Sequence, residues 1–302
     1  MLDSVPLNGQ PRHTLGFIRA RLAEYGVSPK NKLGQNFLID LNLLDVLVDA
    51  ADLHPNDVVL EIGCGTGSLT SRLATKVCAV LGVEIDPNLM QLVRDLLTEH
   101  RNIELIQADV LRNKNALNPN VVTKIDEMRR RHLCSTFKLV ANLPYAVATP
   151  MIANLLINGP GPDRMVVTVQ WEIAERLTAT VGTPHYGALA VLVQSVANAE
   201  VLRKLAPTVF WPRPQVDSAI VRIVPDPAKR EQVGDVPAFR TFLRDLYVHK
   251  RKSLRAALTN WPTGRRDKAV IDKLLEHLGI AGSTRAEELD PAQHCQLWRA
   301  FA

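Results

Sequence analysis

A glycine-rich turn at residues 63–67, with the sequence GCGTG, is the first feature of this 302-residue chain that could support chemistry. Glycine lets the backbone turn sharply and approach a ligand, because no Cβ stands in the way. The dinucleotide-binding pattern G-x-G-x-x-G fails here, since Ser68 stands at its last position, and the Walker pattern fails because its lysine is missing. The turn therefore predicts a nucleotide-type pocket of another kind, and a purely structural turn is the alternative.

Two acidic residues are expected at the same edge of a sheet as this turn. Glu84 ends the apolar run 77–85, and Asp109 follows the apolar run 103–108. The carboxyl ends of parallel strands meet at one edge, where open α/β sheets bind ligands. Glu84 could accept hydrogen bonds from both hydroxyls of a ribose, and Asp109 could accept one from the amino group of an adenine. With the glycine turn they predict a cofactor pocket, and solvated strand ends are the alternative.

A third motif, Asn142-Leu143-Pro144-Tyr145, ends a later apolar run. Together with the E-x-G-x-G-x-G pattern of the turn, it resembles the S-adenosylmethionine-dependent methyltransferases that modify exocyclic nitrogens of bases. An adenine N6 is a poor nucleophile because its lone pair is delocalised into the ring. The resemblance implies that the Asn142 side-chain oxygen and a backbone carbonyl near Pro144 accept the N6 hydrogens, while Tyr145 stacks on the flipped base. A strand-ending Asn-x-Pro turn is the alternative.

Nine short segments, taken in order, carry a closer resemblance. They are KLGQNFLID (32–40), EIGCGTGSLT (61–70), VEIDPNL (83–89), QADVL (107–111), NLPYAVATP (142–150), ERLTA (175–179), YGALAVLVQ (186–194), FWPRPQVDSAIVRI (210–223) and HKRKSLRAAL (249–258). This order resembles the small-subunit rRNA adenine N6,N6-dimethyltransferases, to which the erythromycin-resistance methyltransferases of large-subunit rRNA are related. The resemblance runs from about residue 13 to the end of the chain.

The resemblance implies an activity and roles for particular residues. The activity is the transfer of two methyl groups from S-adenosylmethionine to each of two adjacent adenines near the 3′ end of small-subunit rRNA, on a partly assembled subunit. Asn36 and Leu38 would close over the cofactor from the N-terminal side. Phe210 would be a second aromatic face against the target adenine, and a buried aromatic before a proline-rich turn is the alternative. The cofactor pocket would be completed by Gly63, Gly65, Glu84, Asp109 and Asn142.

Several positions depart from the family pattern. Cys64 stands where the family usually has proline, which should leave the turn working. Trp171 and the pair Pro184-His185 stand where lysines are common, so two RNA-facing cations are expected to be missing. The polar, basic stretch 112–136 is interpreted as an insertion between the third and fourth strands, whose cations could substitute for them.

The elements that must position these residues follow from the apolar pattern. Helical stretches alternate with five apolar strand runs, at 58–62, 77–85, 103–108, 137–143 and 165–170. Strands that are apolar on both faces predict a parallel sheet covered by helices, which is a doubly wound, Rossmann-like α/β fold. Two further runs, 189–198 and 218–225, predict an antiparallel strand pair added to this sheet.

The last part of the chain is expected to be a small helical domain. A proline- and charge-rich linker is expected at 224–237, followed by helices at 238–259, 265–278 and 291–301. Shorter helices are expected nearer the start, at 13–26 and 41–53. The chain thus divides into an N-terminal extension with a helix (1–30), a methyltransferase domain (31–226) and a helical rRNA-binding domain (227–302).

Positive charge is concentrated in the last third of the chain. The 36 lysines and arginines exceed the 31 acidic residues by five, but residues 203–302 carry 18 against 11, a net of +7, and the remainder a net of −2. The densest cluster consists of Lys250, Arg251, Lys252 and Arg255. Cations at this density predict binding to RNA phosphates with affinity that falls as salt rises. A solvated helix face is the alternative.

Composition excludes several other classes. An apolar content of 46% is enough for a buried core, and no apolar run is long enough for a membrane helix. The start of the chain lacks a signal-peptide pattern. Neither a disulfide framework nor a metal site is expected, because the histidines are scattered and the four cysteines (Cys64, Cys78, Cys134 and Cys295) form no C-x-x-C pair. We therefore expect a cytoplasmic monomer that acts on assembling small ribosomal subunits.

Two other functions stay open from the sequence. One is methylation of large-subunit rRNA, giving macrolide resistance. The other is a non-catalytic RNA-binding assembly or transcription factor of the same fold. The acidic residues of the pocket and the Asn142 motif argue against the second.

Overall fold

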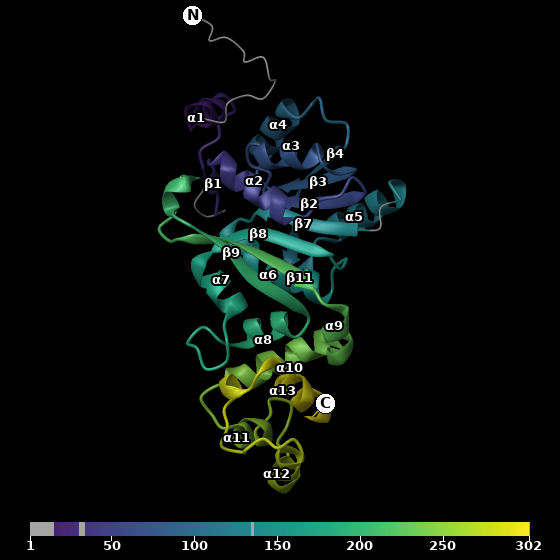
Figure 1. The fold of residues 1–302 in the computed structure, drawn as a ribbon, viewed down its shortest axis with the longest axis vertical. Helices are drawn as coiled ribbons and strands as arrows, with labels where there is room; N and C mark the ends of the chain where they lie inside the picture. The colour runs from purple at the N-terminus through teal and green to yellow at the C-terminus, as the bar shows by residue number, and fades with distance from the viewer. Residues whose placement is uncertain (1–14, 30–33, 134–135, 302) are drawn as a thin grey trace, which may run out of the picture.

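A seven-stranded sheet positions the candidate site. The computed structural model describes residues 15–29, 34–133 and 136–301, and within them the strand order of this sheet is β4-β3-β2-β7-β8-β11-β9 (Figure 1). The parallel strands are β2 (Asp57–Ile62), β3 (Ala79–Glu84), β4 (Ile103–Gln107), β7 (Thr136–Asn142) and β8 (Arg164–Gln170). Antiparallel β11 (Ser218–Pro225) pairs with β8, and β9 (Ala197–Leu205) pairs with β11 at the edge.

Helices cover both faces of this sheet, as strands buried on both faces require. β2 and β3 are buried at every position. One face packs against α2 (Leu41–Ala50) and α3 (Ser68–Ala74), and α4 (Pro87–Leu96) lies over β3 and β4. The other face packs against α6 (Tyr145–Ile157), α7 (Trp171–Thr178) and α5, described next. The predicted doubly wound α/β architecture is confirmed.

The stretch 112–136 is part of this architecture, and its interpretation as an insertion is wrong. It forms a small hairpin, β5 (Leu111–Asn113) with β6 (Ala116–Leu117), and then α5 (Pro119–Arg131), which leads from β4 to β7. Val121, Ile125 and Met128 are almost fully buried against the sheet. These three apolar positions at helical spacing were obscured by the polar residues around them, which face solvent.

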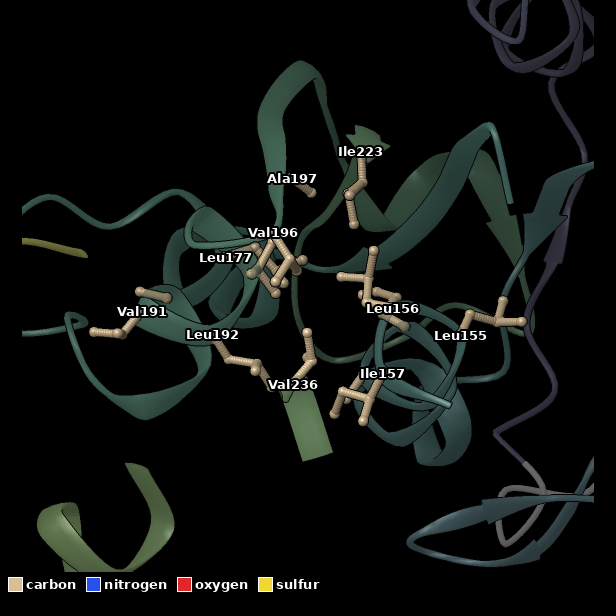
Figure 2. Close-up of a cluster of buried hydrophobic side chains, with 14 of the residues drawn as sticks. Leu155, Leu156, Ile157, Leu177, Val191, Leu192, Val196, Ala197, Ile223 and Val236 are labelled. Carbon is tan, nitrogen blue, oxygen red and sulfur yellow. The ribbon is translucent and has the colours of Figure 1, made fainter. Parts of the chain in front are cut away.

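The predicted strand at 189–198 is also wrong, except at its last two residues. Residues Ala188–Gln194 form helix α8, and the strand β9 begins only at Ala197. Figure 2 shows Val191 and Leu192 of α8 in the cluster that also holds Leu156 and Val236. A short run that is apolar all round can be a buried helix or a buried strand, and periodicity alone does not separate them. Residues 190–193 are buried between the sheet and the C-terminal helices, and in this environment the segment 188–194 forms the helix α8.

The C-terminal helices lie at the lower end of the molecule in Figure 1. The predicted linker contains a helix, α9 (Pro227–Val233), and the predicted helix 238–259 is two helices, α10 (Val236–Val248) and α11 (Leu254–Thr259). The break is explained by Ser253, whose hydroxyl accepts a hydrogen bond from Ala256 N and caps α11. The two remaining helices were predicted, with the first slightly too long, and are α12 (Lys268–His277) and α13 (Pro291–Phe301).

Part of the N-terminal segment lies at the edge of the sheet where the parallel strands end, since the Asn36 carbonyl accepts a hydrogen bond from Asn142 at the end of β7. Helix α1 (Leu15–Glu24) confirms the described part of the first predicted helix, while residues 1–14 and Cys134 lie outside the described residues. Strand β1 (Phe37–Leu38) pairs with β10 (Phe210–Trp211) and so ties this segment to the turn after β9. Short 3-10 turns lie at Pro207–Val209 and Ala286–Glu288. No helix in the described parts of the chain is long and apolar enough to cross a membrane.

Candidate active site

The glycine turn after β2 has the conformation for which glycine is required. Gly63 and Gly65 have φ values of 76° and 56°, in the left-handed region. A Cβ on Gly63 would lie 3.1 Å from Cγ of Pro144, and a Cβ on Gly65 would lie 3.0 Å from the ring of Phe37. Side chains at these two positions would collide with Pro144 of the Asn142 motif and with Phe37 of the N-terminal segment. The glycines therefore let the turn pack closely against both segments.

Glu84 lies at the end of β3 and anchors the turn. Its side chain is 4% exposed, Oε2 accepts a hydrogen bond from Gly65 N at 3.2 Å, and Oε1 accepts one from Asp86 N at 3.0 Å. Burial raises the pKa of this carboxyl, and the backbone hydrogen bonds oppose that shift. Each carboxylate oxygen keeps a further lone pair, so Glu84 can also accept hydrogen bonds from ribose hydroxyls.

Glu61, at the end of β2, is the site residue to which the sequence analysis assigned no role, although it opens the E-x-G-x-G-x-G pattern. It is 2% exposed, and Oε2 has no hydrogen-bond partner among the described residues. Burial, with a smaller contribution from the neighbouring Glu84 charge, raises the pKa of Glu61 to about 8. A buried carboxyl oxygen without a partner is suited to a cationic or hydrogen-bond-donating ligand.

Two adjacent hollows flank the glycine turn. One is lined by Gly34, Gln35, Asn36, Phe37, Gly63, Gly65, Glu84, Ile85, Leu89, Asn142 and Pro144. The other is lined by Phe37, Leu38, Leu44, Glu61, Gly63, Cys64, Gly65, Thr66, Ser68, Leu69 and Asn142. They bring together six of the seven residues expected at the cofactor. The open glycine turn, the Glu84 acceptors and the partnerless Glu61 oxygen fit the ribose and the ammonium group of S-adenosylmethionine.

Asp109 is the exception among the expected cofactor residues. It lies two positions beyond β4, at the same edge of the sheet, but it is exposed and outside the lining of both hollows. Its Oδ1 accepts a hydrogen bond from Leu111 N at 2.9 Å, which holds the turn into β5. Its contact with an adenine stays a prediction.

Asn142 ends β7 between the two hollows. Its Nδ2 donates a hydrogen bond to the Asn36 carbonyl at 2.8 Å, and this contact orients Oδ1 as the acceptor of the side chain. Leu143 is 2% exposed and holds the motif in the core, while the Pro144 ring packs against the Gly63 backbone. The arrangement has the acceptor expected for an amino group, and it rests on a contact with Asn36 that no spacing rule predicts.

The two aromatic residues expected at the target base differ in their surroundings. Tyr145 begins α6 and is half-buried, with its hydroxyl 2.6 Å from Ser218 Oγ; burial raises the pKa of this phenol. Phe210 is only 3% exposed and belongs to the buried cluster that includes Leu38. The ring of Phe210 therefore fits the alternative of a buried aromatic in this conformation, and its contact with a base stays a prediction.

The basic cluster lies in the turn between α10 and α11. Lys250, Arg251 and Lys252 are exposed there. The single helix predicted across this turn would have placed Arg251 and Arg255 one turn apart on one face, but Arg251 precedes α11 and the two residues do not share a helix. Arg255 lies on α11 and forms an ion pair with Asp272 of α12 at 2.5 Å. Three cations are thus presented by a turn, and the fourth also links two helices. Among the described residues, no group of three or more potential ligands could hold a metal ion.

Comparison with known proteins agrees with this geometry. The family model described as "Ribosomal RNA adenine dimethylase" matches residues 26–302. "Ribosomal RNA small subunit methyltransferase A" of Geobacillus kaustophilus is 39% identical over 290 residues, which cover 96% of each chain. The protein of the same name in Staphylococcus aureus is 34% identical over 284 residues, or 93% of this chain and 92% of its own.

Solved structures show the same fold. A crystal structure of a dimethyladenosine transferase from Plasmodium falciparum superposes with a TM-score of 0.70 and 26% identity, over 85% of this chain and 94% of that one. The 23S rRNA methyltransferase ErmE superposes with a TM-score of 0.63 and 24% identity, over 88% of this chain and 99% of that one, which bears on the fold alone. The family match begins at residue 26, just after α1, continues through the last helix and includes every site residue above. The chain therefore belongs to the ribosomal RNA adenine dimethylase family.

Proposed function

We propose that this protein uses S-adenosylmethionine to place two methyl groups on the N6 of each of two adjacent adenines near the 3′ end of small-subunit rRNA. Family membership and the small-subunit relatives support the substrate. The observation that carries the assignment to this site is the contact between Asn142 and Asn36, which leaves the Asn142 amide oxygen as an acceptor beside the two hollows that flank the glycine turn.

The chemistry requires acceptors more than a strong base. The cofactor supplies an electrophilic methyl group on a sulfonium. Asn142 Oδ1 accepts a hydrogen bond from the N6 amino group, which favours a pyramidal nitrogen with its lone pair free to react. Tyr145, held by Ser218, offers a ring against the flipped base. Glu84 and Glu61 serve the ribose and the ammonium group, and a backbone carbonyl near Pro144 is the second acceptor.

We assign RNA binding to the C-terminal helices, and we call the cations Lys250, Arg251, Lys252 and Arg255 the RNA grip. The division into 1–30, 31–226 and 227–302 places one boundary in the turn between β11 and α9. The hydrophobic core continues across this boundary, since Val233, Phe239 and Leu243 pack in the same cluster as the sheet. The helices therefore hold Lys250, Arg251 and Lys252 at a set place relative to the catalytic edge. Arg255 contributes less in this proposal, because Asp272 neutralises it.

Two related functions are less well supported. Methylation of large-subunit rRNA has a fold-level parallel in ErmE, whereas the relatives at 34–39% identity are small-subunit enzymes. A non-catalytic role is opposed by the intact Asn142 motif. We further propose that the protein acts as a monomer in the cytoplasm, where the thiols of Cys64 and Cys295 would stay reduced.

The direct test is methyl transfer to small subunits purified from cells that lack this modification, with the modified positions mapped. We expect Asn142→Ala to lower turnover by about a hundredfold or more while S-adenosylmethionine still binds. A control is Asn102→Ala, because Asn102 donates to the Ala74 and Val77 carbonyls away from the site. It should lower stability and leave turnover of the folded protein unchanged. Normal turnover in the Asn142 variant would refute the acceptor role.

The RNA grip has its own test. Replacing Lys250, Arg251 and Lys252 by alanine should weaken binding to small subunits and reduce the salt dependence of the binding constant. The control replaces Arg129, Arg130 and Arg131, three consecutive arginines at the end of α5, because α5 packs on the sheet and is not the RNA-contacting insertion expected from the sequence. It should leave the salt dependence unchanged. Equal effects of the two triplets would show non-specific attraction only.

A further inference from the structure

A cavity beside α7 is outside the site described above. Its volume is about 340 Å³, within the roughly 300–1,000 Å³ of small-ligand sites. It lies between α7, the segment that leads into α8, and the end of α10, and its lining includes Glu172, Arg176, His185, Tyr186, Tyr247 and Lys250. In Figure 1, α7 lies between β9 and the C-terminal helices. The cavity therefore lies between the catalytic sheet and the proposed RNA grip.

Two hydrogen-bonded tyrosines and two exposed cations line the cavity. Tyr186 donates a hydrogen bond to the Leu289 carbonyl at 2.8 Å, and Tyr247 donates one to the Ala286 carbonyl at 3.4 Å, so both rings are held in place. Arg176 is half-exposed, and its contact with Glu172 is a long 3.6 Å. Lys250 is exposed at the other side of the cavity. An exposed ion pair of this kind is weak, so Arg176 can exchange its carboxylate for a phosphate at little cost.

A third cation continues this line to the catalytic edge. Lys204, near the end of β9, lies 4.5 Å over the ring of Trp171, the first residue of α7. Its Nζ is 2.9 Å from Asp217 Oδ2, and its side chain is 52% exposed. Asp217 precedes Ser218, the partner of the Tyr145 hydroxyl. Lys204 is thus held by an aromatic face and a carboxylate beside the residue expected at the target base.

We propose that the cavity beside α7 receives a nucleotide of the substrate RNA next to the target adenine, with Arg176 and Lys250 contacting its phosphate and Lys204 contacting a phosphate nearer the catalytic edge. This inference rests on the proposed function and adds a path for the RNA between the two sites. A single strand suits it, because an unpaired strand can follow a groove one nucleotide wide.

The test uses the full-length protein and undermethylated small subunits. Arg176→Gln and Lys204→Gln should each reduce the slope of log binding constant against log salt by about 0.7, the value for one single-strand phosphate. Each should raise the KM for subunits several-fold and leave kcat and S-adenosylmethionine binding unchanged. The matched control is Arg222→Gln, which removes another β9–β11 ion pair, with Glu200 at 2.7 Å, at a distance from the catalytic edge.

The outcomes separate this inference from the proposed function. If the unchanged protein does not methylate small subunits, the proposed function fails. If it does, and both variants keep the original slope and KM, the path along α7 is wrong while the proposed function stands. Two variants on different elements guard against misfolding of either one. A slope change in Arg222→Gln equal to that in the test variants would also overturn the path.

Discussion

The two ends of β2 carry buried carboxyl groups in opposite electrostatic situations. Asp57, at the start of the strand, is 1% exposed, and Glu61, at its end, is 2% exposed. Asp57 forms an ion pair with Lys138 Nζ at 2.8 Å and accepts hydrogen bonds from Thr136 and from His54 N. Burial alone would raise the pKa of Asp57, but these partners outweigh it and lower the pKa. Glu61 has no cation beside it among the described residues, and its Oε2 has no hydrogen-bond partner there, so burial outweighs the lowering effect of Thr70 and the pKa of Glu61 rises to about 8.

The difference separates a structural end of the sheet from a functional end. At the Asp57 end, the protein itself supplies every charge and donor that the buried group needs. At the Glu61 end, the same strand leaves a buried oxygen for a ligand to satisfy. Buried polar groups without partners are costly in a fold, so the unpartnered Glu61 oxygen supports the proposed cofactor pocket at this edge.

The largest expected effect comes from removing the cation at the Asp57 end of β2, which we call the compensated end because Lys138 pairs with the buried carboxylate. Lys138→Met should lower the free energy of unfolding by about 3–5 kcal/mol, because it leaves the Asp57 charge buried without its cation. Chemical denaturation at neutral pH measures this. The control is Lys124→Met, which removes the more exposed pair with Glu104 and should cost about 1 kcal/mol or less. A loss below 1 kcal/mol for Lys138→Met would show that the two ends are not different.

The next effect concerns the uncompensated end of β2, at Glu61, and it depends on pH. The pKa of Glu61 is about 8 in the folded protein and 4.5 as its ordinary value. Between pH 4.5 and pH 8, Glu61 is therefore protonated in the folded protein and ionised in the unfolded chain. Its stabilising contribution is therefore present at low pH and is lost as pH rises toward 8. Glu61→Gln removes this dependence. The free energy of unfolding of Glu61→Gln, minus that of the original protein, should therefore increase as pH rises from 6 to 8, by up to about 1.4 kcal/mol per pH unit.

This second prediction is measured on the cofactor-free protein by denaturation at several pH values. Glu99→Gln is the control, because Glu99 is exposed, and its curve should run parallel to that of the original protein. Parallel curves for Glu61→Gln as well would mean that Glu61 is ionised in the fold at neutral pH.

The smallest effect tests one hydrogen bond of the compensated end. Thr136→Val removes the hydroxyl that donates to Asp57 Oδ1 and should cost about 1.5 kcal/mol at neutral pH. Because the pKa of Asp57 is lowered, its stabilising contribution is lost as pH falls below its ordinary value of 3.8, and the variant should lose less on acidification. Thr241→Val, on the exposed face of α10, is the control and should be neutral at every pH.

The apolar pattern predicted β2, β3, β7 and β8 well because these strands are buried along nearly their whole length. It failed where a segment's environment is decided by distant packing. The run at 189–198 is apolar in either conformation, and only the position of α10 and α13 against it made its first half a helix. The three apolar residues of α5 were hidden for the opposite reason, since most of that helix faces solvent.

The sequence by itself determined the parallel strands of the sheet, the glycine turn, and the placement of Glu84 and Asn142 at strand ends, because these depend on local periodicity and on residues close in the chain. Only the tertiary structure decided which partner each polar or charged side chain has and in which direction its pKa shifts. Asp57 meets Lys138 from another strand, Asn142 meets Asn36, and Arg255 meets Asp272. Pairing and pKa depend on distances between residues far apart in the chain, and those distances exist only once the chain is folded.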